Sequence, residues 1–558
     1  MDEKTLIRKH VLANAIKFEG KANPGSIIGK IITEIPDAKT RLKELAKTIN
    51  LVVVEVNKLG VEKQTSELMK LAPEMLAEKP KEEHKLPELK GAEMGKVVTR
   101  IAPEPSKYNH IGHALVFIIQ STYAKLYQGK CIFRLEETNP EKSTMEYYNA
   151  MREDLAWIGL KWDEEYAASD RMDIYYDFAQ KLIKNKNAFV CSCDQETVKR
   201  SREEEKPCKC RKNSVELNTK EWDMMLGKKF KEGERTLRLV GDMSSKNGVM
   251  KDPVIFRISY TPHFLKKDKY CTWPMYDFES AIEDGLKITH IIRSKEFELR
   301  LELHDEIRRL LKLPNPIVRE IGRYQIKGTT TQGREIRAGI ERGEYIGWDD
   351  PSLVTIKALR RRGFVPEMFH ELAMTVGLGK ASGVIDNTVY ESINRKLIDP
   401  VSNRFFFVAD PVKIKIEGAP GRDVELDLHH ENHKGGRKFS TADEFFVAKS
   451  DLEGMEDGDM VRLMDVLNLV KEKKGFKYHS QDHSEYKSKG KMIIHWLPES
   501  SDLVDVEVLM PDKRVAVGLA EKGVNSLKVG DIVQFERFGY CRLDKKEKGK
   551  LMFWYTHK

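Results

Sequence analysis

The stretch that decides the fold is R-I-A-P-E-P-S-K-Y-N-H-I-G-H, residues 100–113. The Val- and Thr-rich run just before it predicts a β-strand, and the apolar residues after it predict a helix from about His110 to Leu126. His110 and His113 are three residues apart, so both lie on one side of the first helical turn, and Gly112 leaves room for a planar ligand. Backbone N–H groups at a helix start attract phosphate, and imidazoles can donate hydrogen bonds to a pentavalent phosphorus. The stretch therefore predicts a nucleotide site, against the alternative that the histidines only cap the helix.

Strands and helices alternate on both sides of this stretch. A second strand is expected at Cys131–Leu135, Thr138–Pro140 has the composition of a helix start, and an amphipathic helix follows through Ile158. Similar patterns recur further along, as strands at 270–278 and 288–292 and as helices at 296–313 and 352–398. This alternation predicts a Rossmann-type, doubly wound parallel sheet.

The two ends of the chain have other patterns. Residues 1–78 show apolar positions at helical spacing, whereas residues 78–95 are charged, contain prolines and lose periodicity, as a linker does. After Pro400, short β-prone runs alternate with Gly-, Asp- and Lys-rich turns, which predicts an all-β, barrel-like region. The predicted domains are a helical N-terminal module with linker at 1–95, the parallel-sheet domain at 96–300 with an insertion at about 190–265, a loop and helical connection at 301–400, and a β-barrel region at 401–558.

Composition narrows the class of protein. The 558 residues suffice for three or four domains of about 150 residues, and 40% apolar residues exclude global disorder. The net charge of +8, from 96 basic and 88 acidic residues, suits a protein that binds a polyanion on patches of its surface. No apolar run approaches the roughly 18 residues that span a bilayer, and the first ten residues lack a secretory signal. Seven cysteines are too few for a disulfide scaffold, so a cytoplasmic protein without a membrane partner is expected.

Four of the cysteines form two close pairs, Cys191 with Cys193 and Cys208 with Cys210. Four thiolates suit tetrahedral Zn²⁺, and the pairs lie among Lys and Arg residues, as expected near RNA. The alternative is four cysteines without a metal. The other three, Cys131, Cys271 and Cys541, are expected in the core.

Five motifs in order along the chain resemble one family. They are H-I-G-H at 110–113, R-L-E-E-T-N-P at 134–140, W-P-M-Y-D-F at 273–278, G-W-D-D-P at 347–351 and L-R-R-R-G at 359–363. Together they resemble the class I glutamyl- and glutaminyl-tRNA synthetases, in particular the archaeal-type glutamyl-tRNA synthetases. The resemblance implies ATP-dependent formation of an aminoacyl-adenylate, followed by transfer of the amino acid to the 3′-terminal adenosine of a tRNA.

The resemblance also implies where the substrates bind. ATP, accompanied by Mg²⁺, is expected on Pro103, Glu104, Pro105, His110, Ile111, Gly112, His113 and Arg323. The amino acid is expected on Arg100, Glu136, Tyr276 and Arg293. The insertion is expected to bind the tRNA acceptor end and to hold the zinc, and the β-barrel region to bind the anticodon.

One loop departs from the family pattern. Class I synthetases carry a loop of K-M-S-K-S type whose lysine stabilises the transition-state phosphates, and the corresponding residues 328–335 read G-T-T-T-Q-G-R-E. The expected lysine position is Gly333. Arg334 or Lys327 could supply the cation instead, and we expect Arg334 to act in catalysis beside His110 and His113.

Arg293 favours glutamate over glutamine. The two side chains are nearly isosteric, so the site must distinguish them by charge, and a guanidinium pairs with a γ-carboxylate but is left unpaired by an amide. The predicted function is therefore glutamylation of tRNA(Glu), with tRNA(Gln) as an open second acceptor.

Three alternatives stand beside this prediction. Arg293 could belong to a surface ion pair with Glu296 or Glu298, and the enzyme could be a glutaminyl-tRNA synthetase. Gly333 and the N-terminal module suggest the third, a catalytically inactive tRNA-binding or scaffold protein, with the N-terminal module as a candidate contact for another protein.

Overall fold

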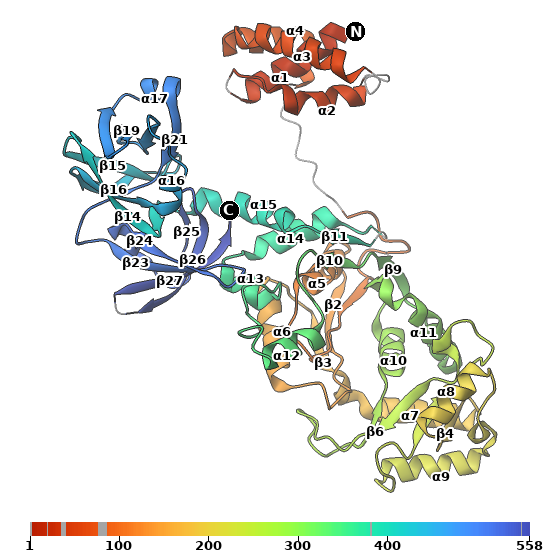
Figure 1. Cartoon of the computed structure of the whole chain (residues 1–558). Helices are drawn as coiled ribbons and strands as arrows, with labels where there is room; N and C mark the ends of the chain where they lie inside the picture. Colours follow the sequence, from red (N-terminus) through yellow and green to blue (C-terminus); the bar gives the residue numbers. More distant parts are fainter. Residues whose placement is uncertain (1–2, 19, 35–40, 76–85, 380–381, 548) are drawn as a thin grey trace. The chain divides into compact units, whose positions relative to one another are not determined.

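The computed structural model describes residues 3–18, 20–34, 41–75, 86–379, 382–547 and 549–558. The chain divides into two compact units, residues 1–85 and 86–558, and each is described by itself (Figure 1). In these described ranges, no helix has both the length and the apolar character needed to cross a membrane.

The first unit is helical throughout its described residues. Its elements are α1 (Glu3–Lys17), α2 (Pro24–Glu34), α3 (Leu42–Asn57), α4 (Val61–Leu71) and the 3-10 turn η1 (Pro73–Met75). Apolar positions at helical spacing, such as Ile27 and Ile49, are the buried ones. The buried Gln64 amide donates to the carbonyl oxygens of Val56 and Leu59, so α4 is tied to the end of α3. The predicted helical N-terminal module is confirmed as a fold.

The centre of the second unit is a parallel sheet. β1 (Val98–Ile101) pairs with β2 (Lys130–Leu135), and β2 pairs with β3 (Glu164–Ala167). β8 (His290–Ser294) lies beside β1, since the Thr289 N–H donates to the Val98 carbonyl at 3.0 Å, and β9 (Ile317–Ile321) pairs in parallel with β8. α5 (Ile111–Leu126) connects β1 to β2, and α6 (Met145–Trp157) connects β2 to β3. The predicted α/β sheet is confirmed, and its strand carboxyl ends share one edge, where ligands bind in such folds.

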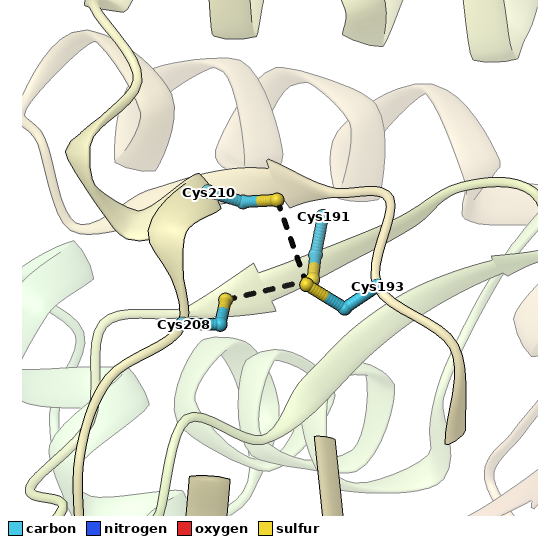
Figure 2. Close-up of side chains that lie close together, drawn as sticks. All are labelled: Cys191, Cys193, Cys208 and Cys210. Carbon is cyan, nitrogen blue, oxygen red and sulfur yellow. Dashed lines mark hydrogen bonds between the residues drawn. The ribbon is translucent and has the colours of Figure 1, made fainter. Parts of the chain in front are cut away.

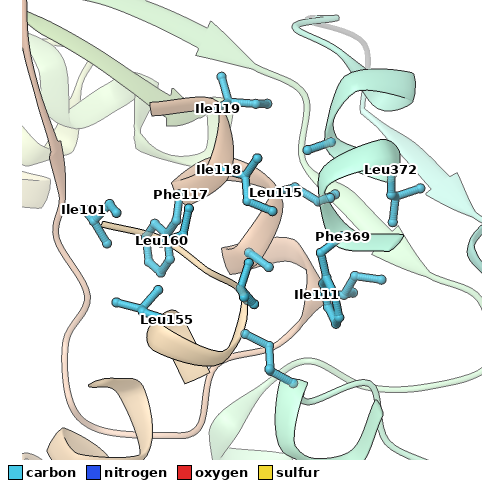
Figure 3. Close-up of a cluster of buried hydrophobic side chains, with 14 of the residues drawn as sticks. Ile101, Ile111, Leu115, Phe117, Ile118, Ile119, Leu155, Leu160, Phe369 and Leu372 are labelled. Atoms are coloured by element: carbon cyan, nitrogen blue, oxygen red, sulfur yellow. The ribbon is translucent and has the colours of Figure 1, made fainter. Parts of the chain in front are cut away.

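A large apolar core fixes the position of α5. Figure 3 shows Ile111 lying toward Phe369 of α14 (Pro366–Val376), while Phe117 lies toward Leu160. Truncating a buried Phe such as Phe369 typically costs about 3–5 kcal/mol. The start of α5, where the two histidines lie, is therefore held by packing along the whole helix.

An antiparallel sheet lies between β3 and β8 in the chain, with strand order β4-β5-β6-β7. This segment and the helices around it comprise the short helix η2 (Ala168–Arg171), α7 (Met172–Lys184), β4 (Ala188–Cys191), α8 (Gln195–Glu203), η3 (Lys209–Lys212), α9 (Val215–Leu226), β5 (Thr236–Leu239), η4 (Gly248–Met250), β6 (Val254–Ile258), β7 (Thr272–Pro274) and α10 (Tyr276–Lys287). Trp222, Phe256 and Trp273 are fully buried in its core.

Helices dominate the chain from residue 295 to 401. The elements are η5 (Lys295–Phe297), α11 (Glu298–Leu311), β10 (Tyr324–Ile326), α12 (Gly333–Glu341), α13 (Ile356–Arg362), α14, β11 (Gly383–Ile385), α15 (Asn387–Ile398) and η6 (Asp399–Val401), with β9 between α11 and β10. β10 and β11 pair in parallel.

The C-terminal region is built from strands, with two short helices, α16 (Lys449–Glu453) and α17 (His483–Lys489), and a 3-10 turn, η7 (Lys522–Ser526). One seven-stranded sheet has the order β12-β25-β26-β27-β23-β24-β13 and the other β21-β18-β19-β20-β14-β17-β22. The edge strands β12 (Arg404–Phe405) and β13 (Phe407–Ala409) are separated by one residue. The edge strands β21 (Gly490–Ile494) and β22 (Leu497–Pro498) are separated by two residues. A short stretch of chain therefore joins the two edges of each sheet, as in a barrel-like sheet. The predicted all-β, barrel-like region is confirmed.

The inner strands of the two sheets, and the β15–β16 hairpin between them, complete this region. They are β14 (Pro411–Glu417), β15 (Arg422–His429), β16 (His433–Thr441), β17 (Glu444–Ala448), β18 (Met460–Leu463), β19 (Leu467–Glu472), β20 (Gly475–Ser480), β23 (Val504–Leu509), β24 (Val515–Ala520), β25 (Ile532–Phe535), β26 (Gly539–Glu547) and β27 (Lys550–His557).

Three local expectations differ from the structure. Thr138–Pro140 does not begin a helix: α6 begins at Met145 with Thr144 as its N-cap, because the Thr138 hydroxyl donates to Glu279 instead. The strand expected at 270–278 is limited to β7, since Tyr276 already opens α10. Residues 86–95, grouped with the linker, pack on the second unit, where Leu89 is buried.

Candidate active site

The carboxyl ends of β1, β2 and β8 open into a cavity of about 620 Å³. Its wall includes most of the residues predicted for ATP and the amino acid, namely Arg100, Pro103, Glu104, His110, Gly112, His113, Glu136, Tyr276, Arg293 and Arg323. Pro105 and Ile111 are buried behind this wall, and Arg334 is exposed outside it.

The two histidines are arranged to donate hydrogen bonds into the cavity. His110 is the N-cap of α5: its Nδ1 accepts from the Gly112 N–H at 3.1 Å, and His113 Nδ1 accepts from the His110 N–H at 3.3 Å. Burial, with the positive charge of Lys107, lowers the pKa of His113 to about 3, and burial lowers that of His110 well below its usual range. Both rings are therefore neutral at pH 7 and carry their proton on Nε2. They cap the helix with one nitrogen and keep the other as a donor.

The part of the cavity where the residues predicted for the amino acid lie rests on a buried ion network. Asp284 accepts from Arg100 Nε at 2.9 Å and from Arg134 Nη1 at 2.9 Å, and Arg134 also donates to Glu136 at 2.6 Å. Although burial opposes it, the two arginines hold the pKa of Asp284 well below its usual range. Arg134 and Asp284 were not among the predicted residues. They fix the positions of Arg100 and Glu136, which were.

Arg293 stands at the same end with most of its guanidinium free. Its Nη2 donates to the Tyr276 hydroxyl at 2.8 Å, while its Nε and Nη1 are buried and have no hydrogen-bond partner. The side chain stacks over Phe297 at 4.8 Å, and no ion pair with Glu296 or Glu298 occurs among the described residues. Burial raises the pKa of Tyr276 to about 12, so its hydroxyl stays protonated. Unsatisfied buried donors of this kind call for an acceptor from a ligand.

The charges at this end of the cavity do not balance. Three guanidinium groups and two carboxylates meet there, those of Arg100, Arg134, Arg293, Asp284 and Glu136. Burial, with the nearby charge of Glu136, raises the pKa of Glu279 well above its usual range and so favours its uncharged form. Among these five groups, only the guanidinium of Arg293 has no ion-pair partner among the described residues. A ligand with one net negative charge would complete the set.

Further cations line the cavity where the residues predicted for ATP lie. Arg323 lines it and lies 3.3 Å from Glu296. Lys327, one of the candidates for the loop cation, is exposed and paired with Asp386 at 2.9 Å, so neither Lys327 nor Arg334 lines the cavity in this conformation. Lys107 does line it, and burial lowers its pKa. Lys107 was missed from the sequence, although it is the one cation between Pro105 and His110.

The four paired cysteines converge on one point. Figure 2 shows Cys191 at the end of β4, Cys193 beyond it, and Cys208 and Cys210 on the segment around η3. Their sulfur atoms all lie within 4.8 Å of one another, with 3.8 Å between those of Cys191 and Cys208 and also between those of Cys193 and Cys210. All four are free thiols, and Arg238 Nη1 lies 3.6 Å from two of the sulfurs. Tetrahedral ligation with metal–sulfur bonds of about 2.3 Å gives sulfur separations of about 3.8 Å, so the cluster fits a metal ion.

Comparison with known proteins places the chain in a family. A family model described as tRNA synthetases class I (E and Q), catalytic domain, matches residues 96–400, and two models described as their anticodon binding domain match residues 402–486 and 493–544. A glutamate–tRNA ligase of Pyrococcus abyssi is 40% identical and one of Pyrococcus furiosus 39% identical, each over 100% of both chains. A solved glutamate tRNA ligase of Elizabethkingia meningosepticum matches 55% of this chain and 70% of its own at 20% identity, with a TM-score of 0.41. With a catalytic-domain match over more than half its length and relatives matched from end to end, the chain belongs to the class I tRNA synthetases of the glutamyl and glutaminyl group.

Proposed function

We propose that the chain activates L-glutamate with ATP and transfers it to the 3′-terminal adenosine of tRNA(Glu). The observation that carries the amino-acid assignment is the unmatched, buried guanidinium of Arg293. Relatives that match the whole chain and are named glutamate–tRNA ligase support the same function.

The charge argument separates glutamate from glutamine. Bound glutamate brings an ammonium and two carboxylates, a net charge of −1, which complements the unpaired positive charge of Arg293. Glutamine brings no net charge, so an amide would leave Arg293 buried and unpaired, at a typical cost of about 3–5 kcal/mol for an uncompensated buried charge. The glutaminyl alternative is therefore disfavoured by the same residue that favours glutamate.

In the first step of the proposed reaction, an oxygen of the glutamate α-carboxylate attacks the α-phosphorus of ATP, and pyrophosphate leaves as the glutamyl-adenylate forms. Glu136 binds the ammonium, and Arg293 with Tyr276 binds the γ-carboxylate. The Nε2–H groups of His110 and His113 donate to the phosphate oxygens as charge builds on the pentavalent phosphorus, while Arg323 is placed for the nucleotide. ATP enters with Mg²⁺, which neutralises part of the phosphate charge.

In the second step, the 3′-terminal ribose hydroxyl of the tRNA attacks the glutamyl carbonyl and AMP leaves. We assign the acceptor end of the tRNA to the insertion and the anticodon to the β-region, which the anticodon-binding models match. tRNA(Gln) is a second acceptor to be tested, because its selection depends on those anticodon contacts.

The four-cysteine cluster is proposed to hold one structural Zn²⁺. The donor set of four thiols with tetrahedral spacing favours zinc over the harder Mg²⁺, and the ion would fix the loop around η3. A cytoplasmic location, in which these thiols stay reduced, remains a prediction from cysteine usage. The N-terminal unit stays a candidate for contact with another protein, since Leu51 and Val54 on α3 are 67% and 56% exposed.

ATP–pyrophosphate exchange with tRNA(Glu) present tests the proposed function. We expect exchange to depend on glutamate and to be far weaker with glutamine at equal concentration. Exchange that favours glutamine would establish the glutaminyl alternative, and a protein that binds tRNA without exchange with either amino acid would be the inactive, scaffold type.

A further inference from the structure

Lys107 presents an unpaired ammonium group to the phosphate end of the cavity. It lies on the loop between β1 and α5 and shares the cavity wall with His110, His113 and Arg323. Within the described part of the chain, no side chain forms an ion pair or hydrogen bond with it. Its two acidic neighbours have partners of their own, since Glu104 accepts from Ser106 and Glu296 pairs with Arg323.

Lys107 lies close to the two histidines. Burial is the main cause that lowers the pKa of each imidazole, and for His110 the neighbouring His113 comes second. The positive charge of Lys107 is the next cause for both histidines. Lys142 also lines the cavity without a described side-chain partner, but it is exposed on the segment after β2 and has no such effect on the histidines. Lys107 therefore combines a place in the cavity wall with a position on the loop directly before the start of α5, three residues from His110.

Gly333 makes room for the Lys107 side chain. A Cβ atom at Gly333 would lie 2.8 Å from Lys107 Cδ and 3.0 Å from its Cβ, both closer than such atoms pack. One turn further along α12, Arg337 Nη1 donates to the Ser106 carbonyl at 2.9 Å, which joins the helix to the Lys107 loop. The Lys107 side chain thus occupies the space that a side chain at position 333 would need.

We propose that Lys107 supplies the cation that stabilises the departing pyrophosphate, in place of the lysine expected at position 333. This inference rests on the proposed function. As the glutamate carboxylate oxygen forms its bond to the α-phosphorus, the bond from that phosphorus to the bridging oxygen breaks, and its electron pair leaves with pyrophosphate. An ammonium group beside the β- and γ-phosphates lowers the energy of that charge as it develops. The site thus keeps a cation for the phosphates, and Lys107 on the loop before α5 supplies it instead of a lysine in the loop at 328–335.

The test is single-turnover adenylate formation by the full-length protein with ATP, glutamate and tRNA(Glu). Lys107→Met removes the charge and keeps the length of the side chain, so we expect kcat to fall by about 10²-fold, the scale for one transition-state donor, with the KM for ATP changed by less than about threefold. Lys107→Arg should retain most of the rate. Lys107→Gly combined with Gly333→Lys should recover at least about tenfold over Lys107→Gly alone, because it clears the stem that blocks a side chain at 333 and returns an ammonium to the same space.

Matched variants separate charge from packing. Lys125→Met removes an exposed lysine from the last turn of α5, away from the cavity, and should leave the rate within about twofold of wild type. Gly333→Ala keeps every charge but displaces the aliphatic part of the Lys107 side chain, so it should slow adenylation although Lys107 itself is unchanged. If Lys107→Met does not fold, Gly333→Ala tests the proposal instead. Thermal unfolding of each variant shows whether a loss of adenylation rate is caused by misfolding.

Two results would overturn the inference while leaving the proposed function intact. One is a wild-type rate for folded Lys107→Met. The other is a large loss in Arg334→Ala or Lys142→Met with no loss in Lys107→Met, which would move the role to that residue. A wild-type protein without glutamate-dependent activity would instead refute the proposed function, and the role of Lys107 with it.

Discussion

Replacing Arg293 by glutamine should reduce the preference for glutamate far more than it reduces the use of glutamine. The Arg293 side chain is 5% exposed, donates to Tyr276 at 2.8 Å and leaves Nε and Nη1 for a ligand. Arg293→Gln removes a buried positive charge that has no ion-pair partner among the described residues. The γ-carboxylate of glutamate would then enter a buried site without the guanidinium that is free to bind it, because Arg100 and Arg134 are already paired with Asp284.

The size of the effect follows from that burial. Truncating one partner of a buried, hydrogen-bonded charge pair costs about 2–5 kcal/mol, much of which reflects the charge left unpaired. At about 1.4 kcal/mol per decade this corresponds to roughly 30- to 4,000-fold. Arg100 remains nearby, although Asp284 neutralises it, so we expect the glutamate-to-glutamine ratio of kcat/KM to fall by about 10²- to 10³-fold.

ATP–pyrophosphate exchange with each amino acid, in the presence of tRNA(Glu), measures this ratio. Arg309→Gln is the matched control, because Arg309 lies exposed on α11 and pairs only with Glu306 at 2.7 Å among the described residues. That variant should keep the wild-type ratio. If Arg293→Gln kept its full preference for glutamate, selectivity would lie elsewhere, most directly at Arg100, and the charge argument would be refuted.

Three further predictions concern the histidines, the cysteines and pH. His110→Ala and His113→Ala should each slow adenylate formation by about 10²-fold while tRNA binding persists, and wild-type single-turnover rates would exclude a phosphate role for the pair. The purified protein should contain one zinc per chain, and Cys208→Ser should lose the zinc and weaken tRNA binding rather than ATP binding. If elemental analysis found no zinc in freshly prepared, chelator-free protein, this prediction would be contradicted. His113 has a pKa of about 3 in the folded protein against about 6.5 when unfolded, so acid favours the unfolded chain and stability should fall as pH drops from 7 towards 5. His113→Gln should reduce that fall in melting temperature, and an unchanged pH profile would show that His113 is not buried in its neutral form.

Local patterns were enough to predict the scaffold of the site. A β-prone run followed by apolar residues at helical spacing defines β1 and α5, and the interval of three residues places His110 and His113 on one helical turn. The strand-rich C-terminal region was equally visible, because its short runs are separated by turn residues. The resemblance to the synthetase family, carried by five ordered motifs, is confirmed by the end-to-end relatives.

Tertiary contacts decide what local patterns could not. Thr138 has the composition of a helix start but bonds to Glu279, which lies far away in the sequence. Asp284 is one acidic residue of an amphipathic helix until the fold brings two arginines onto it. Lys107 and Gly333 are separated by more than two hundred residues, so their contact could not be read from either segment alone.

The arginines of α13 illustrate the same limit. Consecutive arginines at 360–362 suggest contact with RNA or with an acidic partner. Arg361 in fact pairs with Asp349 at 2.8 Å and with Asp544 at 2.7 Å, and the buried Arg362 donates to the Thr556 carbonyl at 2.6 Å. Two of the three charges therefore join the helical connection to the C-terminal strands within this chain.

The most direct test of the central claim is a competition between the two amino acids for the tRNA itself. Wild-type protein would be incubated with ATP, Mg²⁺, tRNA(Glu) and equal concentrations of glutamate and glutamine, and the aminoacyl-adenosine released by nuclease would be identified by mass. The unmatched charge of Arg293 predicts glutamyl-adenosine as the dominant product. Glutaminyl-adenosine as the main product, or no aminoacyl-adenosine at all, would contradict the account.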